Sequence, residues 1–198
     1  LSPYWLEGMR RAAVAVREAG RPWVLDPVAH FATAFRRDAA VELLELKPDI
    51  VRGNASEILA LAGAESRGRG VDSQDPVDAA REAAESLARS RGCVVAVTGE
   101  EDFVTDGERV ARISGGSPLM PKVTALGCSL TCLTGAFAAI SPEDGFAATA
   151  AAFACFAEAG ETAHRQAAGP GSFAAAFLDA LHALSPESLD AERRVRWA

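Results

Sequence analysis

The sequence predicts an α/β fold whose central sheet is mostly parallel and is covered by helices on both faces. Short apolar runs alternate with helix-length segments along the first half of the chain, which is typical of strand–helix–strand crossover units. These runs are continuous, as in residues 93–97, and continuous runs are typical of strands buried on both faces. Several runs end in a polar residue, and sheets of this kind bind ligands beyond the carboxyl ends of their strands. The sequence therefore places its candidate functional residues at that edge.

Capping signals and apolar spacing define the elements of the first half. Ser2 followed by Pro3 predicts the start of a helix, and Gly20 predicts its end. Strands are predicted at 22–25, 49–52 and 93–97, helices at 34–46, 55–62 and 76–91, and a loop at 65–74.

The second half is predicted to be a hairpin followed by helices. Asp106-Gly107 lies between the apolar segments 103–105 and 109–111, which is a hairpin signal. Helices are predicted at 128–140, 142–166 and 173–184. Charged residues dominate the tail at 186–198, for which we expect a terminal surface helix over 187–196. No repeat or linker interrupts the chain, so residues 1–198 are expected to form a single domain.

Composition excludes several classes of protein. The chain has 198 residues, a net charge of −7 and 49% hydrophobic residues, which is typical of a globular protein. Lys and Arg do not cluster with aromatic residues, so no nucleic-acid partner is expected. No run is long and apolar enough to span a membrane, and four cysteines without zinc-type spacing favour reduced thiols in the cytoplasm. Because the chain opens at Leu1 directly into a helix, we expect that an N-terminal part of a longer chain is missing.

Three predicted strands end in residues suited to phosphate chemistry. Asp26 follows the first strand, Arg52 closes the second, and Thr98 closes the third. A carboxylate suits Mg²⁺, a guanidinium suits phosphate oxygens, and a hydroxyl can contact a nucleotide. Each residue alone also has an ordinary explanation, as a turn residue, a surface arginine or a cap.

Asn54 and Glu57 allow two interpretations. Their spacing is that of a capping box at the start of a helix. Alternatively, Glu57 holds Mg²⁺ through water, with Asp26 as the second carboxylate.

A second helix start follows the small-residue turn Ala125-Leu126-Gly127-Cys128. Its free N–H groups and the helix dipole would form a hole for an anion such as a transferring phosphoryl group. The positive end of a helix also favours a thiolate, so Cys128 is a candidate proton acceptor. On spacing alone, a simple turn with a small buried cysteine is the favoured interpretation. No GxxxxGK[ST] loop and no metal-type histidine spacing occur, which argues against a P-loop kinase and a zinc site.

Taken together and in order, the motifs resemble the hydroxyethylthiazole kinase family of the ribokinase-like superfamily. The motifs that carry the resemblance are Leu25-Asp26-Pro27-Val28-Ala29, Ala32-Thr33 with Arg36, Val51 to Ile58, Gly70-Val71-Asp72-Ser73, Val97-Thr98-Gly99-Glu100, Pro118-Leu119-Met120, Val123-Thr124 with Gly127-Cys128-Ser129, and Gly169 to Phe173. The resemblance extends to about residue 184 and implies a three-layer αβα fold with a mostly parallel sheet.

The resemblance also implies an activity: ATP- and Mg²⁺-dependent phosphorylation of the primary alcohol of 4-methyl-5-(2-hydroxyethyl)thiazole, in thiamin biosynthesis or salvage. It implies a cytoplasmic homotrimer with active sites between subunits. The implied roles are ATP binding for Arg52 and Thr98, metal binding for Asp26 and Glu57, an anion hole at Ala125, Leu126 and Gly127, and general base for Cys128.

Two departures from the family pattern leave alternatives open. The anion-hole loop of the family usually reads Gly-Thr-Gly-Cys, whereas Ala125 and Leu126 stand here, and Phe31 replaces a glycine after the unusual His30. These bulkier residues raise the question of whether they crowd the site. The alternatives are a kinase for another small alcohol of the same superfamily, and a homologue that binds thiazole or nucleotide without turnover.

Overall fold

The computed structural model describes residues 1–65, 76–189 and 191–198. Most of the loop predicted at 65–74, including the motif Gly70-Val71-Asp72-Ser73, lies outside these residues.

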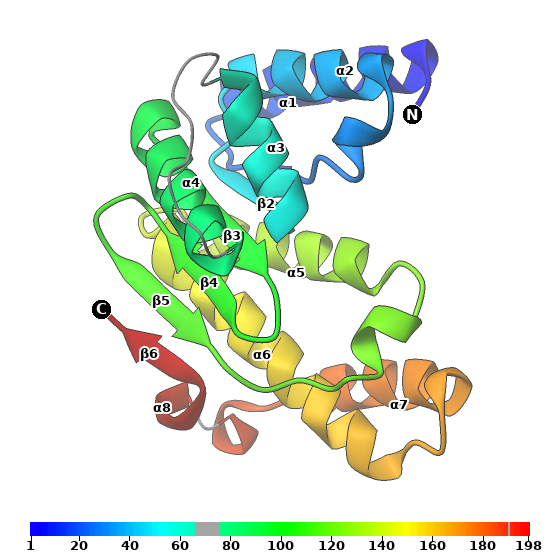
Figure 1. Cartoon of the computed structure of the whole chain (residues 1–198). Coiled ribbons are helices and arrows are strands. Elements are labelled where there is room, and N and C mark those ends of the chain that lie inside the picture. Colours follow the sequence, from blue (N-terminus) through cyan, green and yellow to red (C-terminus); the bar gives the residue numbers. More distant parts are fainter. Residues whose placement is uncertain (66–75, 190) are drawn as a thin grey trace.

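A six-stranded sheet forms the centre of the fold (Figure 1), and its strands follow one another in chain order. They are β1 (Val24–Leu25), β2 (Ile50–Asn54), β3 (Val94–Thr98), β4 (Asp102–Thr105), β5 (Val110–Ile113) and β6 (Val195–Trp197). The strands β1, β2 and β3 are parallel, whereas β3 to β6 pair antiparallel. The predicted α/β class and the hairpin are therefore confirmed. The parallel arrangement is confined to the three strands that deliver the candidate residues.

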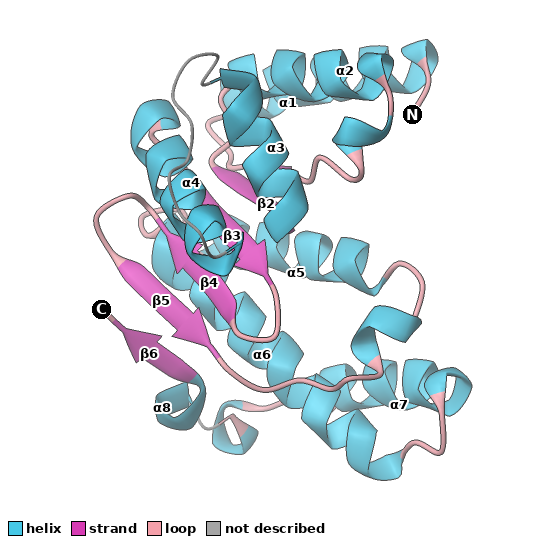
Figure 2. Cartoon of the chain, in the orientation of Figure 1, coloured by secondary structure: helices cyan, strands magenta, loops and turns pink. Residues whose placement is uncertain are grey.

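Helices cover both faces of the sheet, as the arrangement of cyan helices around magenta strands in Figure 2 illustrates. The helices α1 (Pro3–Glu18), α2 (Ala34–Glu45), α3 (Ala55–Glu65) and α4 (Pro76–Arg91) lie on one side, and α5 (Leu126–Ile140), α6 (Gly145–Gln166) and α7 (Pro170–His182) on the other. Alternate strand residues divide between two apolar cores. Val51 and Val95 join the first, and Ile50 and Val94 join the second. This gives the three layers that the resemblance implies.

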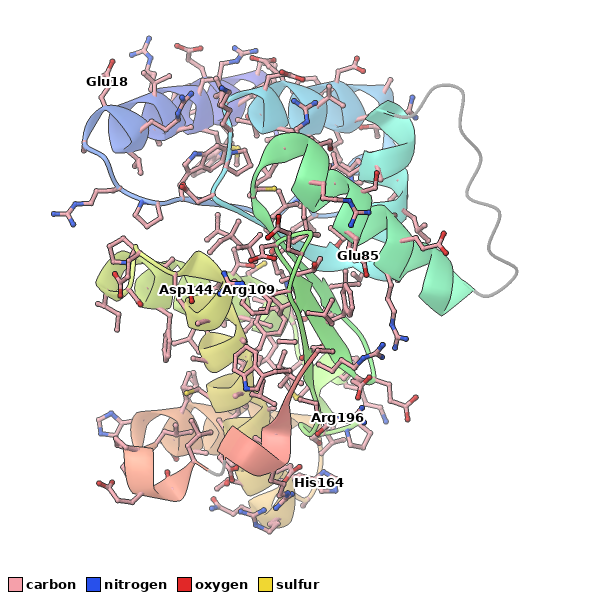
Figure 3. All side chains as sticks on the ribbon, turned by 90° about the vertical axis from the view of Figure 1, so that its left-hand side faces the viewer. Glu18, Glu85, Arg109, Asp144, His164 and Arg196 are labelled. Carbon is pink, nitrogen blue, oxygen red and sulfur yellow. The ribbon has the colours of Figure 1, made fainter. Side chains whose placement is uncertain are left out.

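Local signals explain where the helices begin. Ser2 accepts a hydrogen bond from the Trp5 N–H, as the predicted cap requires. Asp144 caps α6, and its two carboxylate oxygens accept hydrogen bonds from the guanidinium of Arg109 at 3.0 and 3.1 Å. Figure 3 shows these two side chains next to one another, where the end of the hairpin meets the start of α6. Short 3₁₀ turns lie at His30–Ala32 (η1), Met120–Lys122 (η2) and Pro186–Ser188 (η3).

The prediction of a terminal surface helix is wrong. In the described part of the tail, the turn η3 and the single turn α8 (Ala191–Arg194) precede β6, which adds to the free edge of β5. Arg194 is 1% exposed and binds Glu158 and Glu161 of α6. Val195 is buried in the same core as α6. These buried contacts, which the charged composition of the tail conceals, hold the strand against the sheet (Figure 1, red).

None of the helices in the described part of the chain combines the length and apolar character that a bilayer span requires.

Candidate active site at the carboxyl ends of β1, β2 and β3

The strand-end residues that the sequence singles out meet in one cluster. Leu25 is level with Val51, and Asn54 with Thr98, so the three parallel strands end at the same edge of the sheet. The Arg52 guanidinium lies between its neighbours and donates to Asp26 Oδ2 at 3.3 Å and to Thr98 Oγ1 at 3.1 Å. The Arg52 and Asp26 side chains are only 11% and 10% exposed. A shielded ion pair therefore joins all three strands.

The helix α5 reaches the cluster from the other layer. Thr131 donates its hydroxyl proton to Asp26 Oδ2 at 2.6 Å. Gly127 lies directly beside Arg52, and a Cβ on Gly127 would stand 3.1 Å from one guanidinium nitrogen. Glycine is therefore the residue that lets the start of α5 approach the guanidinium this closely.

The two oxygens of Asp26 differ in their environment. Oδ2 accepts from both Thr131 and Arg52, whereas Oδ1 is buried and has no hydrogen-bond partner among the described residues. Burial raises the pKa of the Asp26 carboxyl, and the Thr131 hydrogen bond and the Arg52 charge partly offset this rise. An orphaned buried oxygen on a carboxylate is a ready ligand for a cation or for a hydroxyl group.

Glu57 forms the predicted capping box. Its Oε2 accepts from the Asn54 N–H, and its own N–H donates to Asn54 Oδ1, both at 2.9 Å. Its Oε1 accepts from the Ala29 N–H at 2.9 Å. The side chain is 7% exposed, and it joins the start of α3 to the segment that follows β1. Both oxygens thus serve the backbone, so a metal would interact with Glu57 only through water.

The start of α5 is exposed as an anion site requires. Ala125 precedes the helix with φ 66°, a left-handed conformation that favours glycine. The Ser129 N–H donates to the Ala125 carbonyl. The N–H groups of residues 126–128 lie in the first turn and therefore have no carbonyl partner within the helix. Leu126 is 8% exposed and packs into the core, so its side chain points away from the site. Cys128 is exposed on the first turn.

His30 and Phe31, which depart from the family pattern, lie in η1 and do not fill the space beside Asp26 and Arg52. Phe31 is 48% exposed and meets His30 edge-on, with ring centroids 5.8 Å apart. His30 is buried, and its Nδ1 lies 3.1 Å from the Pro27 carbonyl oxygen. Ala29 adopts φ 47°, which directs its N–H to Glu57.

Two residues near the cluster are absent from the sequence-based assignment. The first is Thr131, whose bond to Asp26 joins residues 105 positions apart. The second is Asp102, the first residue of β4, whose Oδ1 accepts from the Gly99 N–H at 2.9 Å. Burial raises the pKa of Asp102 to about 6, and the Gly99 N–H and the charge of Arg52 oppose the rise. For Thr131, a usable signal existed: it lies one helical turn after Gly127 and hence on the same face.

The surface has two hollows of about 490 Å³, one beside the cluster and one away from it. One is bounded by α1, β1, η1 and α2, is largely apolar and reaches Asp26 and His30. The other includes Asp49, Gly92 and Gly145, at the opposite end of the strands from the cluster. Among the described residues, no group of three or more His, Cys, Asp or Glu side chains is arranged to hold a metal. Any metal here would therefore need substrate or water oxygens in addition to Asp26.

Comparison with known proteins identifies the family. Residues 1–187 match the model described as "Hydroxyethylthiazole kinase family". The chain belongs to the hydroxyethylthiazole kinase family. A protein named hydroxyethylthiazole kinase from Rhizobium leguminosarum bv. trifolii is 68% identical over 195 residues, which cover 98% of this chain and 73% of the relative. A protein of the same name from Cereibacter sphaeroides is 66% identical over 197 residues, covering 100% of this chain and 74% of the relative.

Solved structures agree with this membership. The hydroxyethylthiazole kinase protein from Pyrococcus horikoshii OT3 has a TM-score of 0.89 at 34% identity, covering 100% of this chain and 74% of the other. A pyridoxal kinase from Staphylococcus aureus in complex with ADP has a TM-score of 0.59 at 23% identity, covering 79% of this chain and 58% of the other. The second likeness concerns the fold alone, and it places this member of the hydroxyethylthiazole kinase family among ribokinase-like folds.

Proposed function

We propose that this protein transfers the γ-phosphoryl group of ATP to the primary alcohol of 4-methyl-5-(2-hydroxyethyl)thiazole. The observation that carries the proposal is the shielded Arg52 guanidinium, which bridges Asp26 and Thr98 and faces Gly127 at the start of α5. Cation, carboxylate, hydroxyl and helix start are the groups that phosphoryl transfer needs, because its transition state spreads negative charge over oxygens. Family membership supplies the acceptor alcohol.

Arg52 and Thr98 hold the ATP phosphates in this account. The guanidinium presents planar N–H donors to phosphate oxygens, and Thr98 places a hydroxyl beside it. The N–H groups of Leu126 and Gly127, which follow Ala125 at the start of α5, receive the transferring phosphoryl group. They are fixed in place before the reaction, so they stabilise charge without reorganising.

Asp26 fits a Mg²⁺ ion through its orphaned Oδ1, and Glu57 contributes through water. When bound, Mg²⁺ neutralises charge on the phosphate oxygens. The residues that position Asp26 for this task are Thr131 and Arg52, which occupy its other oxygen.

Cys128 acts as the general base. Its exposed sulfur accepts the alcohol proton while the alcohol oxygen forms a bond to the γ-phosphorus. The bond between that phosphorus and the bridging oxygen of ATP breaks, and ADP leaves. The helix start stabilises the charge that builds on the phosphoryl oxygens.

We also infer a cytoplasmic homotrimer with active sites between subunits. The support for both is the family resemblance. Light scattering coupled to size exclusion tests the oligomer, with three times the chain mass as the expected result.

Product analysis by phosphorus NMR tests the reaction. The chain is incubated with ATP, Mg²⁺ and the thiazole alcohol, and then again with the thiazole lacking its hydroxyl group. A phosphomonoester signal is expected only with the alcohol. ADP release with a different alcohol would indicate another kinase of the superfamily, and ATP binding without any product would indicate a non-catalytic homologue.

A further inference from the structure

Two cysteines occupy consecutive turns on the exposed side of α5. The buried residues of this helix recur every four positions and form one stripe, namely Leu126, Leu130, Thr134 and Ala138. Cys128 and Cys132 are both exposed and lie off this stripe. The remaining cysteines, Cys93 and Cys155, are buried. The chain therefore offers solvent one pair of neighbouring thiols.

Helix geometry sets the spacing of the pair. Side chains four residues apart lie on the same face, with about 5–6 Å between their Cβ atoms. A disulfide needs Cβ atoms about 3.5–4.5 Å apart, so a direct S–S bond would require the helix to distort. A single atom that bonds both sulfurs at about 2.3 Å spans the wider gap and leaves the helix intact. The spacing thus suits a bridging ligand better than a disulfide.

Thiolates select soft ligands. Cysteine sulfur binds soft, thiophilic centres in preference to the hard oxygen-bound cations that serve phosphate chemistry. We propose that Cys128 and Cys132 of α5 form a two-thiol site for a soft thiophilic centre, represented by a trivalent organoarsenical. This class of ligand is distinct from the nucleotide, the thiazole and Mg²⁺.

The reaction of the arsenical with the two thiols needs no oxidant. An arsenical R–As=O reacts with the two thiols to give R–As(S–Cys)₂ and one water molecule. Two As–S bonds form, the arsenic–oxygen bond breaks, and both thiol protons leave with that oxygen. Arsenic stays trivalent, and neither sulfur changes its oxidation state.

Capture would also inhibit the enzyme. Cys128 would be blocked at the start of α5, so proton transfer from the alcohol would stop. This consequence rests on the proposed function, whereas binding of the arsenical does not.

Binding is tested with phenylarsine oxide on the whole chain by native mass spectrometry. The expected result is one adduct per chain, with the mass of the reagent less one water, and the loss of two titratable thiols. The adduct should withstand excess monothiol and yield to a dithiol. The Cys132→Ser variant, which keeps Cys128, should need roughly a hundredfold more reagent, because it loses the second bond. Cys155→Ser serves as the matched control and should behave as the unmodified chain.

Two results would overturn the proposal: absence of the two-thiol adduct, or equal sensitivity of Cys132→Ser and the unmodified chain. Kinase activity measured in the same samples separates the two hypotheses. Inhibition of the unmodified chain that Cys132→Ser resists supports both. A two-thiol adduct that leaves phosphorylation unaffected supports the site and contradicts Cys128 as the general base.

Discussion

Replacement of Thr131 by valine probes the connection between α5 and the sheet. The change removes the hydroxyl that donates to Asp26 Oδ2 at 2.6 Å and keeps the side-chain shape. A hydrogen bond to a charged group contributes about 1.5–3 kcal/mol. Because Thr131 is one of the groups that lower the pKa of Asp26, its loss should raise that pKa. A free energy of this size corresponds to a roughly ten- to hundredfold effect on an equilibrium.

The sign of the pH effect follows from the role of Asp26. In the proposed function Asp26 acts as a carboxylate, so kcat/KM should fall as pH falls through its pKa. In Thr131→Val the acid limb of the profile should therefore lie at higher pH, and kcat/KM on that limb should fall about ten- to hundredfold.

The assay is kcat/KM against pH for the unmodified chain, Thr131→Val and Thr131→Ser. Serine retains the hydroxyl and should restore the original profile. Urea unfolding provides the control for stability. Superimposable profiles for the valine variant and the unmodified chain would show that Thr131 has no influence on the ionisation of Asp26.

Three further predictions concern the free energy of unfolding, which urea denaturation measures in each case. Ala125→Gly should stabilise the protein by about 1 kcal/mol, because glycine adopts φ 66° without strain; a destabilised variant would contradict this. Asp102→Asn should remove one pH dependence of the free energy of unfolding. Because the pKa of Asp102 is raised from 3.8 to about 6 in the folded protein, the protonated side chain stabilises the fold at low pH, and this stabilisation is lost as pH rises through 6. The unmodified chain should therefore lose stability relative to the variant between pH 3.8 and 6, and parallel curves of stability against pH would contradict this. Arg194→Met should lower the free energy of unfolding by about 3–5 kcal/mol, because it leaves two carboxylates without their partner beside a position that is 1% exposed. The same change at the exposed neighbour, Arg193→Met, should lower it by less than about 1 kcal/mol. Equal losses in the two variants would contradict a stabilising role for the buried ion pairs of Arg194.

The elements that the sequence predicts well are those with strong local signals. Ser2-Pro3 marks the start of α1, and Asp106-Gly107 marks the hairpin between β4 and β5, because caps and turns depend on adjacent residues. The strand β6 was not predicted. Its pairing with β5 and the burial of Arg194 depend on Glu158 and Glu161, which lie more than thirty residues away.

In the candidate site, too, residues with local sequence signals are predictable, whereas residues that depend on distant contacts are not. Asp26, Arg52 and Thr98 are predictable because each lies at or near the carboxyl end of an apolar strand, and parallel strands end at one edge, although β2 continues two residues beyond Arg52 to Asn54. The spacing of Thr131 from Gly127 places it on the same face of α5, but its partner Asp26 lies 105 positions away and is evident only in the assembled layers. Asp102 was also missed, because its bond to the Gly99 N–H appears only when the turn between β3 and β4 forms. For Glu57, the sequence left capping and metal binding open. The structure forms the cap and commits both oxygens to backbone N–H groups, so any role with Mg²⁺ is indirect.

We propose that phosphoryl transfer takes place at the first turn of α5, beside Arg52. Steady-state kinetics of Cys128→Ser, together with calorimetric titration of ATP, test this proposal. We expect kcat to fall about a hundredfold or more while the dissociation constant of ATP stays the same, because serine does not readily form an anion and Arg52 is untouched. An unchanged kcat would exclude Cys128 as the general base.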